Sequence, residues 1–267
     1  MDIYRGKLET MDYIFFATTE RGKVYETGAY IHNYALSYAL GLAKSPYFHQ
    51  LQKPKYQEDL EPLNQLGIYL TPARPLEISY RLIQWNTIQE VYGFPKKERN
   101  IGYPDWGFAR VIRPGSTFEF YVAIANPNCL AKFPNFENFL TGKGYIRLGK
   151  FMGKSCLRFK KAEKVEDKEG KFDARITKKR ERKEKQGRTE SLLLNWRDIP
   201  VDPIICDIYP STLPTRLIAN PKYKFGKYYL VEFEETDKEI EKIAQVFLPA
   251  NMSFVARSLT TKKSRKK

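Results

Sequence analysis

Residues 160–190 constrain the fold of this sequence more than any other segment. Lysine, arginine, aspartate and glutamate dominate there, and Val165 and Ile176 are the only branched aliphatic side chains. Such a segment cannot bury enough apolar surface to fold alone, so we interpret it as a flexible basic insertion. The apolar residues that make up 42% of the chain must then build the core from residues 1–159 and 191–257.

The order of apolar runs in residues 1–159 predicts an α+β protein. We expect strands at 3–17, 68–71, 76–85, 108–112, 117–125, 145–148 and 155–159, helices at 28–41 and 135–140, and a surface loop at 45–67. The Arg-Pro-Gly-Ser run at 113–116 predicts a hairpin turn between two of these strands. The expected elements follow the order strand, helix, paired strands, short helix and strand. This is the order of a ferredoxin-like or RNA-recognition-motif sheet.

Two segments are expected to extend from this core. Residues 86–106 hold two prolines and two glycines around the charged string Lys96-Lys97-Glu98-Arg99, which predicts a long protruding connection. Residues 191–257 are expected to form a smaller, mainly-β C-terminal part that completes the fold. The remaining residues, 258–267, form a lysine-rich tail that we expect to be disordered.

The net charge of +15 is concentrated in two places. Residues 158–188 hold 14 basic and 7 acidic side chains, and residues 257–267 hold 6 basic and no acidic ones. These two segments therefore carry 7 + 6 of the 15 excess charges, and the rest of the chain is nearly neutral. Charge runs are often simply solvated, but beside a folded basic patch they favour salt-sensitive contacts with nucleic acid.

The most informative stretch is 138–162, which has no aspartate or glutamate. Its basic residues are Lys143, Arg147, Lys150, Lys154, Arg158, Lys160 and Lys161. Glycines among them would permit close approach of backbone N–H groups to phosphates, and Tyr145, Phe151 and Phe159 offer faces on which bases can stack. We interpret the stretch as an RNA-binding surface, against the alternative of a sheet edge with solvated lysines.

The sequence offers few groups for catalysis or metal binding. Cys129, Cys156 and Cys206 are far apart, and His32 and His49 are the only histidines; we expect no metal site, disulfide or cofactor. A lone histidine near a helix is more often inert than a general base. No apolar run approaches the roughly 20 residues of a membrane span, and no secretory signal is visible, so we expect a cytoplasmic protein without membrane contact.

Three segments together resemble a known family. They are Ile-Tyr-Arg-Gly-Lys-Leu (3–8), Val-Tyr-Glu-Thr-Gly-Ala-Tyr-Ile-His-Asn-Tyr-Ala-Leu-Ser-Tyr-Ala-Leu-Gly (24–41) and Tyr-Ile-Arg-Leu-Gly-Lys-Phe-Met-Gly-Lys (145–154). They are similar to the Csc-one proteins, the subtype I-D branch of the Cas-five family in CRISPR effector (Cascade) complexes. The resemblance covers most of residues 1–160, and neither the basic insertion nor the tail matches any part of it.

The resemblance implies a RAMP-superfamily, ferredoxin-like domain with a long β-hairpin insertion. It implies a crRNA-binding subunit that holds the 5′ handle of the guide and caps the backbone of the complex. The implied neighbours are Cas-seven-like backbone subunits, the large Cas-ten-like subunit and target DNA near the protospacer-adjacent motif (PAM). The excursion at 86–106 would be a thumb that wedges the guide, with Lys96, Lys97 and Arg99 as its candidate contacts.

The resemblance also implies that this member is not an enzyme, with no catalytic residue to assign. The main alternative is a metal-independent endoribonuclease that uses His32 or a set of tyrosines and lysines, since a subtype I-C relative cleaves CRISPR repeat RNA. A second alternative is a protein-interaction module that meets acidic partners through charge alone.

Overall fold

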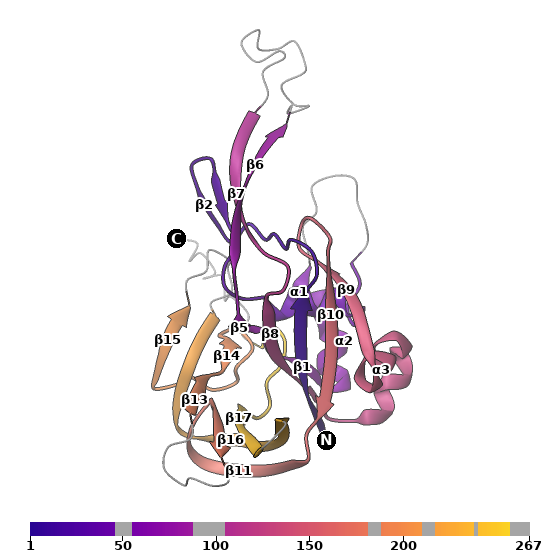
Figure 1. Ribbon diagram of the computed structural model, residues 1–267. Coiled ribbons are helices and arrows are strands. Elements are labelled where there is room, and N and C mark those ends of the chain that lie inside the picture. The colour runs from indigo at the N-terminus through magenta and orange to yellow at the C-terminus, as the bar shows by residue number, and fades with distance from the viewer. Residues whose placement is uncertain (46–54, 88–104, 181–187, 210–216, 238–239, 257–267) are drawn as a thin grey trace, which may run out of the picture.

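The computed structural model describes residues 1–45, 55–87, 105–180, 188–209, 217–237 and 240–256. Across these ranges three curved sheets account for most of the regular structure, and the helices are few and short (Figure 1). The chain is therefore a mixed α and β protein, as expected. None of the helices in the described ranges is long and apolar enough to cross a membrane.

The first sheet is built by the N-terminal part of the chain. Its strands are antiparallel in the order β4-β8-β1-β10-β9, and β5 also pairs with β8. They are β1 (Asp2–Thr10), β4 (Ile68–Leu70), β5 (Arg74–Glu77), β8 (Thr117–Ile124), β9 (Lys143–Leu148) and β10 (Gly153–Lys161). The helices that pack on one face are α1 (Asn33–Ala39), α2 (Tyr56–Leu66), the 3-10 helix η2 (Pro127–Lys132) and α3 (Pro134–Thr141). Helices α1 and α2 lie behind the sheet in Figure 1, so its open face points toward the viewer.

The second sheet contains most of the C-terminal half. Its order is β11-β16-β17-β12-β13, with β14 and β15 also paired to β16. The strands are β11 (Lys164–Asp173), β12 (Arg175–Arg180), β13 (Arg188–Ser191), β14 (Leu193–Asn195), β15 (Ile205–Tyr209), β16 (Leu217–Asp237) and β17 (Ile240–Pro249). Ile3 and Tyr121 of the first sheet are buried in its core cluster, so the two sheets share apolar packing.

The prediction of a flexible insertion at 160–190 is wrong for the residues that the structure describes there, because most of them form strands. Strands β11 and β12 pair with β16 and β17, which supply the apolar partners that the segment lacks. A strand needs buried side chains on one face only, and Phe172, Ala174 and Ile176 provide them. Exposed charges on β11 pair with one another, as Glu166 does with Lys164 and Lys168. Residues 181–187 lie outside the described part, as does the tail at 258–267.

A third sheet, in the order β2-β3-β7-β6, projects from the rest of the molecule (Figure 1). It consists of β2 (Thr19–Arg21), β3 (Val24–Glu26), β6 (Tyr80–Thr87) and β7 (Asp105–Ile112). Strands β6 and β7 are antiparallel and pair out to Thr87 and Asp105, so the excursion expected at 86–106 begins as a two-stranded stem. Residues 88–104, with Lys96, Lys97 and Arg99, lie outside the described residues.

Three local expectations were wrong. The turn at 113–116 is real, but β7 and β8 on its two sides belong to different sheets, so it forms a corner and not a hairpin. The loop expected at 45–67 contains helix α2, which buries Leu60 and Leu63 and ends at Gly67 with a left-handed φ of 67°. The helix expected at 28–41 begins only at Asn33, because Ile31 pairs with Ala73 in an isolated bridge.

The buried carboxylate of Asp198 joins the two halves of the chain. It accepts hydrogen bonds from Asn33 Nδ2 (2.7 Å), the Tyr34 hydroxyl (2.9 Å), the Tyr69 hydroxyl (3.2 Å) and the Val255 backbone N–H (2.9 Å). Burial raises its pKa to about 6, although these hydrogen bonds oppose the shift. The donors come from α1, β4 and the C-terminal segment, so one side chain fixes three elements that are distant in sequence.

Replacement of Asp198 by alanine should strongly destabilise the protein. The change leaves several buried donors without an acceptor, each costing about 1–3 kcal/mol, so we expect a loss of at least about 3 kcal/mol in urea-induced unfolding. The matched control is Asp207→Ala, which removes an exposed carboxylate bonded to Asn220 and should cost less than about 0.5 kcal/mol. Equal losses for the two variants would contradict this account of the junction.

His32 caps the N-terminus of α1. Its Nδ1 accepts a hydrogen bond from the Tyr34 backbone N–H at 3.2 Å, and burial lowers its pKa from 6.5 to about 4. The unfolded chain takes up a proton at this ring below about pH 6.5 and the folded chain does so only near pH 4. The stability that the neutral ring provides is therefore present above pH 6.5 and is lost as the pH falls toward 4.

The substitution His32→Asn should remove this loss, because asparagine is a good helix cap and does not titrate. Between pH 7 and pH 4 we expect the wild type to lose about 3 kcal/mol relative to the variant. Urea midpoints compared at each pH measure the difference. Parallel pH profiles would show that His32 does not titrate differently in the two states.

Candidate nucleic-acid interface

The open face of the first sheet carries most of the basic residues of the acid-free stretch. Successive side chains of a strand point to opposite faces, and β9 follows this rule: Lys143, Tyr145 and Arg147 are exposed, while Gly144, Ile146 and Leu148 are buried. In β10 the exposed residues Lys154 and Arg158 point the same way. In β1, Lys7 joins them. We call Lys7, Lys143, Arg147, Lys154 and Arg158 the basic sheet face.

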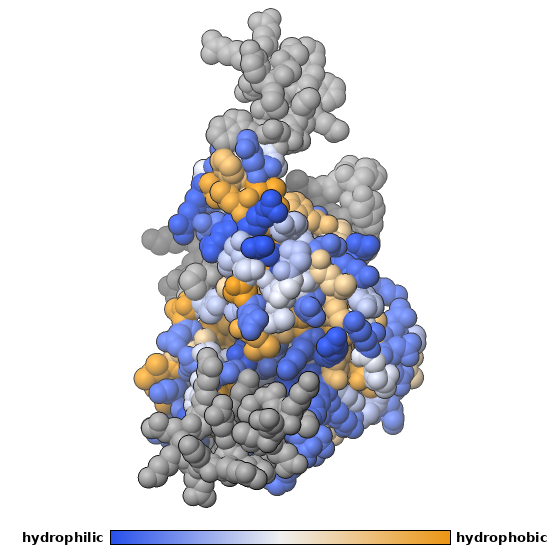
Figure 2. Space-filling view, in the orientation of Figure 1, coloured by the Kyte–Doolittle hydropathy of each residue, from blue (hydrophilic) through white to orange (hydrophobic). Residues whose placement is uncertain are grey.

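The strand register sets these cations directly opposite one another. Lys7 pairs with Arg158 across β1 and β10, and Arg158 pairs with Lys143 across β10 and β9. One step along, Lys154 faces Arg147. Lys7 also faces Glu119 across β1 and β8, whereas the pairs of β9 and β10 face cations only. Like charges in directly opposed positions destabilise a sheet, so these pairs cost stability unless an anion lies over them. Hydrophilic residues accordingly gather over the region of β1 and β10 in Figure 2.

Tyr145 lies between the two cation rows. Its ring is 45% exposed, with Lys154 Nζ 4.3 Å and Lys143 Nζ 5.4 Å from the ring centroid. Phe151 at the β9–β10 turn is also exposed and contacts Phe15. Phe159 instead packs edge-on against Phe120 and Phe136 in the core, so it is not a stacking face. An exposed aromatic ring among cations is a common platform for single-stranded nucleic acid.

The other three expected binding residues lie elsewhere. Lys150 is in the turn between β9 and β10, where its backbone N–H donates to Phe15 O at 2.8 Å. The Lys160 Nζ donates to the Glu234 carbonyl of the second sheet. Lys161 forms an ion pair with Asp2 at 2.8 Å. Lys7 was missed, because only the order of the strands shows that β1 lies beside β10.

The glycines of the stretch have a different role from the one expected. A Cβ on Gly149 would lie 2.5 Å from Phe15 O, and one on Gly153 would lie 2.5 Å from Tyr13 O. Gly144 lies equally close to the ring of Phe139. These glycines therefore let neighbouring parts of the chain pack against β9 and β10, and they do not form a phosphate cradle.

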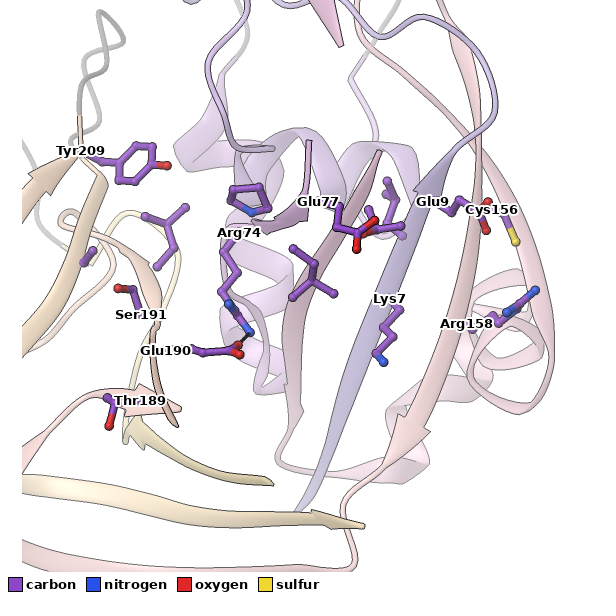
Figure 3. Close-up of a pocket in the computed structure, with 16 residues that line it drawn as sticks. Lys7, Glu9, Arg74, Glu77, Cys156, Arg158, Thr189, Glu190, Ser191 and Tyr209 are labelled. Atoms are coloured by element: carbon purple, nitrogen blue, oxygen red, sulfur yellow. Dashed lines mark hydrogen bonds and ion pairs between the residues drawn. The ribbon is translucent and has the colours of Figure 1, made fainter. Parts of the chain in front are cut away.

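A cleft of about 830 Å³ opens beside the basic sheet face (Figure 3). Lys7, Glu9 and Arg158 line it from the first sheet, and Thr189, Ser191 and Tyr209 line it from the second. It lies within the range of volumes typical of ligand sites in proteins. The cation row Lys143–Arg158–Lys7 thus leads directly into a cavity between the two sheets.

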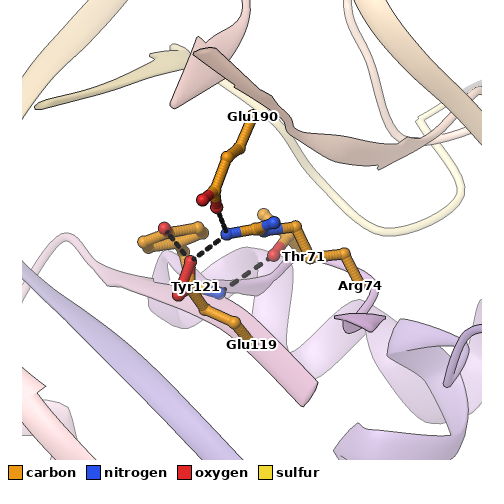
Figure 4. A network of polar contacts seen from close by, with 5 residues as sticks. All are labelled: Thr71, Arg74, Glu119, Tyr121 and Glu190. Atoms are coloured by element: carbon orange, nitrogen blue, oxygen red, sulfur yellow. Dashed lines mark hydrogen bonds and ion pairs between the residues drawn. The ribbon is translucent and has the colours of Figure 1, made fainter. Parts of the chain in front are cut away.

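Arg74 joins the two sheets at the cleft (Figure 4). Its Nη2 lies 3.1 Å from Glu119 Oε1 on β8 and 2.5 Å from Glu190 Oε2 on β13. The Tyr121 hydroxyl donates to Glu119 at 2.5 Å, and burial, reinforced by the Glu119 charge, raises the pKa of Tyr121 well above its ordinary value. The hydroxyl thus stays protonated and Glu119 accepts from two donors. This network links β5 and β8 of the first sheet to β13 of the second.

The histidines and cysteines lie apart from the basic sheet face. His32 is partly buried as a helix cap with a lowered pKa, and His49 lies outside the described residues. Cys129 and Cys156 are buried and Cys206 is partly buried, all as free thiols. In the described part of the chain no three His, Cys, Asp or Glu side chains cluster in a way that could hold a metal ion.

Comparison with solved structures finds a chain of an assembly titled "Type IV-B CRISPR Complex". The likeness covers 60% of this chain and 90% of that chain, at 10% identity and a TM-score of 0.31, and is too weak to support an argument. A comparison with curated proteins finds no match.

The sequence matches a family model over residues 1–257. The match includes the strands of 164–180 and the whole second sheet, for which the sequence analysis found no family pattern. The model describes the type I-D CRISPR-associated protein Cas5/Csc1. Because the match covers nearly the whole chain, this protein belongs to the type I-D CRISPR-associated Cas5/Csc1 family.

Proposed function

We propose that this CRISPR effector subunit binds crRNA through the basic sheet face and holds the 5′ handle of the guide. The observation that carries the proposal is the pair of cation rows that flank exposed Tyr145. Phosphates would relieve the repulsion between opposed cations and release counterions on binding, while a base stacks on the tyrosine. Both interactions suit a single strand better than a duplex, whose bases are not free to stack.

The connectivity of the first sheet supports the ferredoxin-like RAMP fold expected for such a subunit. The β-α-β-β-α-β order of that fold is followed by β1, the helices α1 and α2, β4, β8, helix α3 and β10. The four strands lie as β4-β8-β1-β10. On this proposal β9 is an added edge strand that widens the binding face.

Two other surfaces fit a place within a larger complex. The β6–β7 stem projects from the body (Figure 1), as a thumb beside the guide would. Ile204, Ile205, Ile208 and Phe225 are each at least 60% exposed, and apolar surface of this kind suits a protein neighbour. We propose that the neighbours are Cas-seven-like backbone subunits and the large Cas-ten-like subunit, near the target DNA and its PAM.

We further propose that the subunit binds the guide without cleaving it. His32, the expected general base of the endoribonuclease alternative, is partly buried, and its Nδ1 already accepts the Tyr34 backbone N–H in the helix cap. A general base must come within hydrogen-bonding reach of the hydroxyl that it activates. The proposal therefore assigns the chain the role of a binding subunit.

Charge reversal on the basic sheet face should weaken RNA binding. We expect the double variant Lys154→Glu/Arg158→Glu to lose roughly 100-fold in affinity for a labelled single-stranded repeat RNA, measured by fluorescence anisotropy. The slope of log affinity against log salt should fall by about 1.4, since each cation removed from a single strand contributes about 0.7.

The matched control is Lys132→Glu/Lys224→Glu, which makes the same change in net charge at exposed positions away from the face. It should bind RNA nearly as well as the wild type. If both double variants lost affinity to the same extent, binding would depend on net charge alone and the proposed face would be wrong. Site-specific cleavage of the RNA by the wild type would contradict a purely binding role.

A further inference from the structure

Two carboxylates in the cleft have no apparent structural purpose. Glu9 on β1 and Glu77 on β5 line it, both are exposed, and neither forms an ion pair or a side-chain hydrogen bond with another described residue. Figure 3 shows both within the cleft, on the side of the first sheet. Unlike them, Glu190, the third carboxylate that lines the cleft, pairs with Arg74.

The sheet register places them in a row next to the cations. Glu9 and Glu77 both face Thr117 of β8, one from each side. On the other side of Glu9, the row continues through Cys156 to Tyr145. The neighbouring row runs through Lys143, Arg158 and Lys7. Glu9, Glu77 and Tyr145 therefore lie in a row that runs parallel to the row of cations. The two rows are two residues apart along each strand.

We propose that the cleft binds one unstacked nucleotide whose base carries an amino group, with Glu9 and Glu77 accepting hydrogen bonds from it. The inference rests on the proposed function, because the same strand would lie on the basic sheet face. Lys7 and Arg158, at the end of the cation row, hold the phosphate. The base then points away from the cation row and into the cleft.

The charges of the cleft select which end of the nucleotide enters. A phosphate beside Glu9 and Glu77 would meet two negative charges, whereas at Lys7 and Arg158 it meets two positive ones. The opposite wall offers Tyr209 as an apolar face and the hydroxyls of Thr189 and Ser191. The volume of about 830 Å³ falls within the range of pockets that enclose small ligands.

The carboxylates also determine which bases fit. Cytosine presents its N4 amino group, and a glutamate accepts from it in known nucleic-acid contacts. Adenine and guanine likewise carry amino groups on their pairing edges. Uracil has carbonyl oxygens and a single N–H there, so its oxygens would face the carboxylates without a proton between them. The cleft therefore discriminates against uracil.

The test compares two labelled eight-nucleotide RNAs, oligo(C) and oligo(U), with the full-length protein in fluorescence anisotropy. The probes have the same charge, and phosphate contacts carry no sequence information. We expect the wild type to bind oligo(C) about tenfold more tightly, the size of one good base contact. In the variant Glu9→Gln/Glu77→Gln, the ratio of the affinities for oligo(C) and oligo(U) should be close to one. This variant should bind oligo(U) at least as tightly as the wild type does.

Two further variants complete the design. Glu20→Gln/Glu137→Gln removes the same charge from exposed positions outside the cleft and should keep the wild-type ratio. Ser191→Trp fills the cleft from an exposed position on β13 and should abolish the preference. Circular dichroism of each variant verifies that it is folded.

The outcomes separate this inference from the proposed function. Equal wild-type affinity for both probes, with Lys154→Glu/Arg158→Glu weakening both, would overturn the cleft site and leave the RNA-binding face intact. A preference for cytosine that survives in Glu9→Gln/Glu77→Gln would also overturn it. If neither probe bound, both proposals would fail. If Ser191→Trp left both affinities unchanged but dissociated the chain from its effector complex, the cleft would take a protein partner instead.

Discussion

Burial of the Asp198 carboxylate is the constraint on which the arrangement of the sheets depends. An ionised carboxylate is costly to remove from water unless hydrogen bonds compensate, and here the donors are supplied by α1, β4 and the segment near residue 255. Asp198 follows β14 of the second sheet, whereas α1 and β4 belong to the first. The bonds can be satisfied together only when the two sheets are docked, and the docked sheets define the cleft. Arg74, which bridges Glu119 and Glu190, fixes the same docking from the other side.

The sequence grouped the cations of the basic sheet face well where the signal was local. The acid-free run at 138–162 included Lys143, Arg147, Lys154 and Arg158, and alternation along β9 and β10 places these four on one side of the sheet. It did not separate Lys160 and Lys161 from this group, since their directions depend on Glu234 and Asp2. The sequence could not show that Lys7, Glu9 and Glu77 lie beside this group. Their positions follow from the order of strands in the sheet, which no local pattern encodes.

The fold errors have the same origin. Residues 164–180 lack the composition of an independent fold, and their strands exist because β11 pairs with β16 and β12 pairs with β17. The corner at 113–116 has the chemistry of a hairpin turn, but the partners of β7 and β8 are chosen by distant strands. The glycines, expected to let phosphates approach the backbone, instead let Phe15 and Tyr13 pack against β9 and β10. Local propensity thus located the turns and strands, and tertiary pairing determined what they contact.

The opposed cations on β1, β9 and β10 have a consequence for the life of the subunit before assembly. In a chain without its ligand, Arg158 faces Lys143 and Lys154 faces Arg147 with no anion over them, so its native state is less stable than that of the same chain with an anion bound. On the proposed function, occupancy and folding are then thermodynamically linked: subunits with a guide bound would be more stable, and unoccupied ones would unfold and be degraded sooner. The face that captures the ligand would in this way also bias the cellular pool toward loaded particles.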